Sequence, residues 1–260
     1  MNGLRGELNG ILAIWYRELK VFQREKSRIV ASIASPVLWL VIFGGGLGSS
    51  VSIEGMSYQT FIFPGILAQS VLFSSIFFGV YIVWDRKIDF LKEVLVAPIT
   101  RSSMFMGKVV GGATDSMIQS CVLLDIGAGM EKAGMLPGLH IGIGGMAWML
   151  LILLLTAISM VSIGLIIGSY MESPEGFQLI SSFLLFPLFF LSGALFPIGR
   201  LPAWLAPLTI IDPLTYSVDG LRNVILGSSQ FHLAHDIGII GTVSVLLIFA
   251  GTAAFERMKL

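Results

Sequence analysis

Six long apolar runs constrain the fold of this chain more than any other feature. They cover residues 29–48, 61–83, 104–127, 141–169, 177–196 and 237–255. A bilayer core of about 30 Å needs about 20 mostly apolar residues per helix, so each run is long enough to cross a membrane. A membrane β-barrel would instead show strands of about ten residues with alternating polarity. The runs are continuously apolar, and they predict an all-α integral membrane protein with six transmembrane helices.

The composition and the charge distribution support a membrane protein. Only 12% of the residues are charged, whereas a soluble domain carries about 25%. The formal net charge of zero gives no electrostatic reason to expect a nucleic-acid partner. If the N-terminus is cytoplasmic, 13 of the 16 Lys and Arg residues fall on that side, and three fall outside: Lys132, Arg200 and Arg222. The positive-inside rule therefore predicts a multi-pass protein of the plasma or inner membrane with both termini in the cytoplasm.

Residues 1–28 are predicted to form a cytoplasmic leader, and residues 29–260 one polytopic transmembrane domain. In the leader, Ile11, Trp15, Leu19 and Phe22 recur at helical spacing, with basic residues elsewhere around the helix. This pattern favours an amphipathic helix in the headgroup layer, with Trp15 at the interface; a solvated helix is the alternative. Because residues 1–28 lack an apolar signal-peptide core, we expect the first span to act as an uncleaved signal anchor.

The segment after the fifth run carries helix-breaking and helix-starting signals. Three prolines interrupt it at intervals of five residues: Pro197, Pro202 and Pro207. Ser173-Pro174-Glu175 and Asp212-Pro213 each place an N-cap residue before a proline at the first helical position. We therefore expect short re-entrant helices at the outer face, with Trp204 and Tyr216 at the membrane interface.

The sequence offers no support for an enzyme or a metal site. The pair Gly107-Lys108 is followed by Val109 and lacks the earlier glycine of a phosphate-binding loop, so the chain is not expected to hydrolyse ATP. His232 and His235 have a spacing that metal sites use, but ordinary interfacial histidines are favoured because only Asp236 accompanies them. Cys121 is the only cysteine in the sequence, so an internal disulfide is excluded. We expect it to be a small buried residue within a span.

Residues 85–101, DRKIDFLKEVLVAPITR, form a charged segment between the second and third runs. In a helix, one face would carry an apolar stripe of Ile88, Leu91 and Leu95. Another face would carry a charged stripe of Asp85, Asp89 and Lys92. Ala97-Pro98 ends this helix. A helix lying on lipid is one interpretation, but such helices carry mainly basic polar faces. The mixed charge favours docking on a cytoplasmic protein.

Two stretches resemble the motifs of ABC-2 type transporter permeases. Residues 85–108 contain an arginine-led charged helix, a Glu-x-Leu-x-x-Pro-Ile core and a Gly-Lys pair. Residues 190–222, FLSGALFPIGRLPAWLAPLTIIDPLTYSVDGLR, are similar to the second hallmark of the family, with Ser-Gly, Phe-Pro, Leu-Pro-x-Trp and Asp-Pro-Leu-Thr-Tyr. The resemblance extends from about residue 15 to the C-terminus.

The resemblance implies the permease subunit of an exporter that moves an amphipathic or lipid-like substrate. It implies a second permease copy, expected to be a homodimer, and two ABC ATPase subunits that use ATP and Mg; this chain itself would bind no cofactor. By position, the helix that couples to the ATPase would contain Arg86, Lys87, Phe90, Leu91, Glu93, Val94 and Leu95. Membrane lipids are the other expected contacts. The alternative is a membrane scaffold or assembly subunit that docks a cytoplasmic protein without transporting anything.

The third run carries polar residues on one face. Lys108, Asp115 and Gln119 are separated by seven and four residues, so they lie on one side of a helix. A charged side chain at the centre of a transmembrane helix costs about 2.5–3.5 kcal/mol, so this face should point into the bundle or a watery path. Structural hydrogen bonding and lining of the transport path by Asp115 and Gln119 both remain open.

Overall fold

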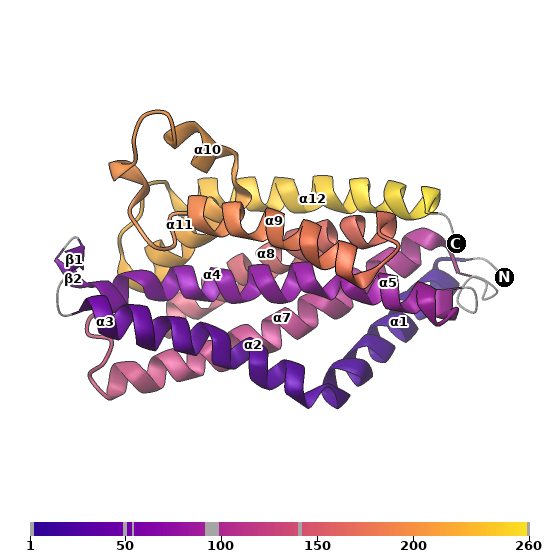
Figure 1. Cartoon of the computed structure of the whole chain (residues 1–260), viewed down its shortest axis with the longest axis horizontal. Helices are drawn as coiled ribbons and strands as arrows, with labels where there is room; N and C mark the ends of the chain where they lie inside the picture. Colours follow the sequence, from indigo (N-terminus) through magenta and orange to yellow (C-terminus); the bar gives the residue numbers. More distant parts are fainter. Residues whose placement is uncertain (1–2, 49–50, 54, 92–98, 140–141, 259–260) are drawn as a thin grey trace.

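The computed structural model describes residues 3–48, 51–53, 55–91, 99–139 and 142–258. Six of its helical segments are long and apolar enough to cross a membrane: Lys26–Gly48, Tyr58–Lys87, Arg101–Lys132, Gly144–Tyr170, Pro174–Leu191 and Leu233–Arg257. They lie side by side along one axis (Figure 1). The chain is therefore an all-α integral membrane protein, as its six apolar runs predict.

The elements follow one another in a simple up-and-down order. The N-terminal half contains α1 (Leu4–Arg24), α2 (Lys26–Trp39), a π-helical turn (Leu40–Gly44), α3 (Gly45–Gly48), the two-residue strands β1 (Ser52–Ile53) and β2 (Met56–Ser57), α4 (Tyr58–Phe78) and α5 (Val80–Lys87). The remainder contains α7 (Arg101–Lys132), α8 (Ile143–Tyr170), α9 (Pro174–Leu191), a 3-10 turn (Ile198–Arg200), α10 (Ala206–Ile211), α11 (Pro213–Leu226) and α12 (Leu233–Arg257).

The two ends of the bundle differ. The beginning of α1 and the ends of α5 and α12 lie at one end, which we call the N/C end (Figure 1). The hairpin of β1 and β2 lies at the opposite end, which we call the hairpin end. The charged segment after α5 therefore begins at the same end as both termini.

Helices α4 and α8 occupy the centre of the bundle. Helix α4 is apolar on all sides and packs against α7, α8 and α11, as expected for a helix surrounded by other helices. Gly164 and Gly168 of α8 meet the backbone around Ile76 and Gly79, where an added Cβ at either glycine would clash. These small residues let α4, α5 and α8 approach closely.

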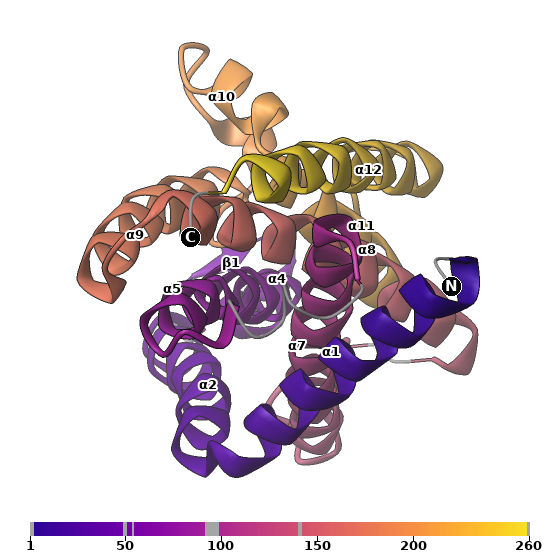
Figure 2. The same ribbon diagram turned by 90° about the vertical axis from the view of Figure 1, so that its right-hand side faces the viewer.

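The leader helix α1 crosses the N/C end diagonally and packs against α7 (Figure 2). Its buried face consists of Gly10, Ile14, Glu18 and Phe22, offset from the predicted stripe of Ile11, Trp15, Leu19 and Phe22. Ile14 and Glu18 pack over Gly107 and Gly111, which leave room for them on α7. Trp15 is half-buried, and its Nε1 donates a hydrogen bond to Thr114 Oγ1 of α7 at 3.1 Å; its interfacial position stays a prediction.

The proline signals predict the segment between α9 and α12 correctly. Ser173 and Asp212 cap α9 and α11 with their side chains, and short helices replace a further full span. Trp204 is exposed, but Tyr216 is buried and donates to Ile210 O at 2.8 Å. The interfacial prediction for Tyr216 is therefore wrong, because α11 packs between α4, α8 and α12.

Two further sequence-based predictions need correction. Cys121 is exposed on α7 rather than buried. The fifth span ends at Leu191 instead of 196, because the chain turns at Ser192 and Gly193, and Gly193 has a positive φ of 76°.

Candidate functional site

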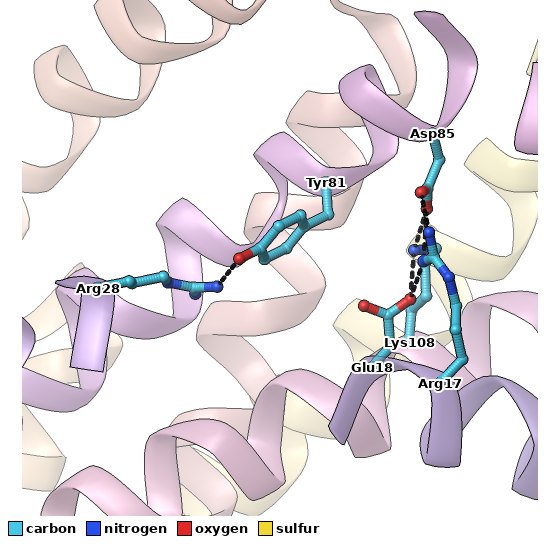
Figure 3. A network of polar contacts seen from close by, with 6 residues as sticks. All are labelled: Arg17, Glu18, Arg28, Tyr81, Asp85 and Lys108. Atoms are coloured by element: carbon cyan, nitrogen blue, oxygen red, sulfur yellow. Dashed lines mark hydrogen bonds and ion pairs between the residues drawn. The ribbon is translucent and has the colours of Figure 1, made fainter. Parts of the chain in front are cut away.

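A cluster of four charged side chains lies at the N/C end, where α1, α5 and α7 meet (Figure 3). Lys108 Nζ of α7 donates to Asp85 Oδ2 of α5 at 2.6 Å and to Glu18 Oε1 of α1 at 2.8 Å. Arg17 Nη2 donates to Asp85 Oδ1 at 2.6 Å, and Arg17 Nη1 donates to Glu18 Oε1 at 2.7 Å. We call Arg17, Glu18, Asp85 and Lys108 the charge cluster.

The charge cluster is buried but balanced. The side chains of Lys108 and Glu18 are each 1% exposed, and that of Asp85 is 3% exposed. Two cations face two anions, which offsets the large cost of removing isolated charges from water. Among the described residues, Glu18 Oε2 has no hydrogen-bond partner. The cluster ties three elements together, and loss of one member would leave a buried charge uncompensated.

The charged segment is not one continuous helix from Asp85 onward. Helix α5 ends at Lys87, and Asp89 has a φ of 57°, the left-handed conformation that interrupts a helix. Asp85 is buried and bonds to Lys108, whereas Asp89 is exposed, so the prediction that the two residues share one charged stripe is wrong. The bend separates the end of the second span from the residues that follow it.

Three of the four described residues of the predicted coupling helix contact other elements of the bundle: Arg86, Phe90 and Leu91. Arg86 donates to the carbonyl oxygens of Ser169 and Met171 at 2.8 and 2.9 Å, which caps the end of α8. The Lys87 ammonium lies 5.5 Å from the ring centre of Trp84.

Beyond the bend, Phe90 lies under the Arg17 guanidinium at 3.9 Å, and Leu91 is buried in an apolar cluster with Ile14 and Phe105. Glu93, Val94 and Leu95 lie outside the described residues.

The polar face of α7 is buried, as predicted. Asp115 and Gln119 are 2% and 1% exposed. Asp115 Oδ1 and both amide atoms of Gln119 have no hydrogen-bond partner among the described residues, whereas Ser116 between them bonds to Ser74 and Ser75. Neither Asp115 nor Gln119 lines the groove described next. Their place in a transport path remains a proposal.

A groove of about 530 Å³ runs between α2, α4 and α9. Six aromatic side chains form much of its wall: Trp39, Phe73, Phe77, Phe186, Phe189 and Phe190. Gln69 lies among them, and its Oε1 is buried without a hydrogen-bond partner in the described part of the chain. The groove therefore offers a large apolar surface with an unused polar group.

Arg28 lies at the N/C end of this groove. It donates to the Tyr81 hydroxyl, which in turn donates to Glu25 (Figure 3 shows Arg28 and Tyr81). Its guanidinium also lies 4.8 Å from the Tyr81 ring centre and pairs with Glu25 Oε2 at 3.7 Å. A cation at one end and aromatic rings along the wall are the features that an amphipathic molecule needs.

The second sequence motif holds the hairpin end together. Arg222 Nη2 donates to Gly193 O at 2.9 Å, and its guanidinium lies 4.2 Å from the Phe61 ring centre. The Asp219 carboxylate accepts from the backbone N–H groups of Gln230 and Phe231. In the described residues no group of three or more metal-binding side chains is present, and His235 instead contacts the rings of Tyr216 and Phe231.

Sequence reasoning missed half of the charge cluster and the whole groove. Arg17 is one of the basic residues that the leader pattern places away from the apolar stripe, and the pattern does not single out Glu18. Glu18 packs against Gly111 because of the position in which α1 docks on α7. Helical periodicity predicts which residues share a face, but not which residues of another helix that face meets. A glutamate on the apolar side of an amphipathic helix is the one signal that marks such a residue.

These features define a class of protein: a polytopic α-helical membrane protein with a groove between its spans and a charged segment that begins at the N/C end. The sequence matches the ABC-2 type transporter family over residues 9–226. The chain belongs to this family, and it is a transmembrane permease subunit of an ABC-type transporter. The family associates with ABC ATPases.

Curated relatives cover nearly the whole chain. Nodulation protein J of Rhizobium meliloti (strain 1021) is 28% identical over 255 residues, which are 95% of this chain and 92% of the relative. The inner membrane transport permease YadH of Escherichia coli (strain K12) is 27% identical over 245 residues, covering 91% and 88% of the two chains. The match therefore extends beyond the two motifs to the full membrane bundle.

Proposed function

We propose that this chain is the permease of an exporter that moves an amphipathic or lipid-like substrate outward, driven by ATP that two separate ATPase subunits hydrolyse with Mg. The observation that carries the proposal is the aromatic groove between α2, α4 and α9. Its wall suits an apolar tail, while Arg28 and Gln69 suit a polar head. A scaffold subunit would have no use for such a groove.

The protein would lie in the inner or plasma membrane of the cell, and its N/C end would face the cytoplasm. The excess of Lys and Arg at this end supports the orientation. The relative from Escherichia coli carries the name of an inner membrane permease, which supports the inner membrane as the location. The ATPase would then meet the residues from Arg86 to Leu95.

A second copy of the chain would pack against α9. Large apolar residues are exposed on one side of this helix at spacings of four, three and four: Leu179, Phe183, Phe186 and Phe190. This spacing is that of a helix–helix seam. Phe186 and Phe190 also line the groove, so a partner helix would continue its wall. We therefore propose a homodimer in which two grooves adjoin.

A matched pair of tryptophans tests the groove. Trp39 lines the groove, stacked on Phe43 at 4.4 Å, whereas Trp148 is exposed elsewhere on α8. We expect Trp39→Ala to reduce stimulation of ATP hydrolysis by a panel of amphipathic compounds in the reconstituted complex, and Trp148→Ala to leave it unchanged. Equal stimulation in both variants would contradict the groove assignment.

Charge reversal at Glu93 tests ATPase docking. If residues 86–95 dock on the ATPase, Glu93→Arg replaces an attraction by a repulsion, so less ATPase should co-purify and export should fall. A segment that only lies on lipid would bind an anionic membrane at least as well after this change. Unchanged ATPase capture and unchanged export at matched expression would refute docking. Leu91 is less suitable for this test because it packs into the bundle's own core.

A further inference from the structure

We propose that Arg17 and Lys108 are positioning residues that join the ATPase-docking segment to α1 and α7, so that a displacement of the segment moves all three together. This inference rests on the proposed function, because it takes the residues after α5 as the ATPase contact. It goes further by naming the side chains through which the movement enters the bundle. The leader helix α1 would then transmit the displacement of the docking segment, together with α7.

Asp85 is the centre of this joint. Its Oδ1 accepts from Arg17 of α1 and its Oδ2 accepts from Lys108 of α7, each at 2.6 Å. A carboxylate held on both sides by cations cannot shift far without breaking a charge-assisted hydrogen bond. Asp85 lies in the last turn of α5, so the helix end is fixed to two other elements.

Arg17 spans the bend in the segment. The chain leaves helical geometry at Asp89, and Arg17 binds Asp85 before this point and covers the ring of Phe90 after it. The planar guanidinium can form a forked hydrogen bond and stack on a ring at the same time, which a lysine ammonium cannot. Arg17 therefore holds both sides of the place where the segment could pivot.

Lys108 connects the joint to the membrane bundle. It lies in the second turn of α7 and also binds Glu18, so α1 is attached to α7 at the same point. On the other side of α5, Arg86 binds the last carbonyls of α8. A push on residues 88–91 would thus reach α1, α7 and α8 through specific polar contacts.

Amide hydrogen exchange in the purified permease tests the joint directly. With Arg17→Gln, exchange at residues 88–91 should rise at least about tenfold, because the segment loses a charge-assisted contact and opens locally. Exchange in α8 and α12 should change little. Arg5→Gln on the same helix is the control, since Arg5 is exposed. Unchanged exchange at 88–91, or equal loosening of the whole bundle, would overturn the proposal.

Coupling in the complex separates positioning from mere stability. With the ATPase that co-purifies with the wild-type chain, Arg17→Gln should retain ATPase capture and ATP hydrolysis, while export per ATP falls about tenfold. Arg17→Lys should restore part of the export, because it keeps the charge opposite Asp85. Full export with Arg17→Gln would overturn the joint and leave docking intact. If the wild-type chain captures no ATPase, the proposed function itself fails.

Discussion

Asp85 and Lys108 form a buried ion pair with an N–O distance of 2.6 Å. The two residues are 23 positions apart and belong to different spans, α5 and α7. Their side chains are 3% and 1% exposed, so water does little to screen the attraction between them. The pair holds the second span to the third at the N/C end.

Removing the Lys108 charge should strongly destabilise the bundle. Lys108→Met leaves Asp85 and Glu18 buried with Arg17 as the remaining cation of the cluster, and breaking a buried pair in this way costs about 3–5 kcal/mol. Denaturant titration of the purified permease in micelles would show the loss in free energy of unfolding. Lys132→Met is the control, because Lys132 is exposed at the other end of α7. Equal effects of the two substitutions would contradict the assignment.

The charge cluster shows what the sequence could and could not predict. The spacing of Lys108, Asp115 and Gln119 predicted correctly that this face of α7 is buried, because helical periodicity is local information. The partners of Lys108 are not local. Glu18 comes from a helix whose docking face depends on the glycines of α7, and Asp85 appeared to belong to a solvent-facing segment.

The six spans could be predicted from the sequence for a physical reason that does not apply to the groove. Bilayer thickness sets the length of an apolar run, so the number of spans follows from the sequence. The groove depends on which sides of α2, α4 and α9 meet, and phenylalanine is equally suited to lipid contact and to a binding wall. Phe183 and Phe189 of α9 illustrate this, since one is 83% exposed and the other 1%.

Close packing at Gly164 gives a second prediction. An added Cβ at Gly164 meets the backbone of Ile76, which cannot move aside as a flexible side chain could. Gly164→Ala should therefore lower the free energy of unfolding by about 1–3 kcal/mol, the usual cost of overpacking. At Gly144 of the same helix a Cβ meets no neighbouring atom. There the same change should be neutral or stabilising by up to about 1 kcal/mol. Thermal unfolding of both variants distinguishes the two sites.

Asp212 should make stability depend on pH. Burial raises the pKa of its carboxyl to about 8, against the opposing effect of the hydrogen bond from Leu214 N. An unfolded aspartate titrates near pH 3.9, so between about pH 4 and 8 the folded chain holds a proton that the unfolded chain releases. Stability should therefore fall as pH rises through this range.

The variant Asp212→Asn distinguishes the effect of this carboxyl group on stability from the effects of other titrating groups. Asp212→Asn keeps a cap oxygen for Leu214 N but cannot ionise. The fall in melting temperature from pH 5 to pH 8.5 should be smaller in the variant than in the wild type. An identical fall in both proteins would assign the pH dependence to other groups.

The two ends of the bundle should lie on opposite sides of the membrane, with the N/C end in the cytoplasm. In a Cys121→Ser background, Lys132→Cys at the hairpin end should react with an impermeant maleimide added to intact cells. Arg5→Cys should react only after the cells are permeabilised. Both side chains are exposed, so burial does not bias the comparison. Labelling of Arg5→Cys in intact cells would reverse the orientation that the positive-inside rule predicts.

The exposed seam of α9 should be the contact between two copies of the chain. If α9 packs against its two-fold mate with the axis beside Phe183, the most exposed residue of the seam, Phe183 of one copy lies close to Phe183 of the other. Phe183→Cys in the Cys121→Ser background should then form a disulfide-linked dimer under mild oxidation in membranes. Phe249→Cys on α12 is the matched control, since Phe249 is 70% exposed but lies on a different helix. We expect little cross-linking from it. Efficient cross-linking of Phe249→Cys with none from Phe183→Cys would place the interface on α12 and remove α9 from the dimer.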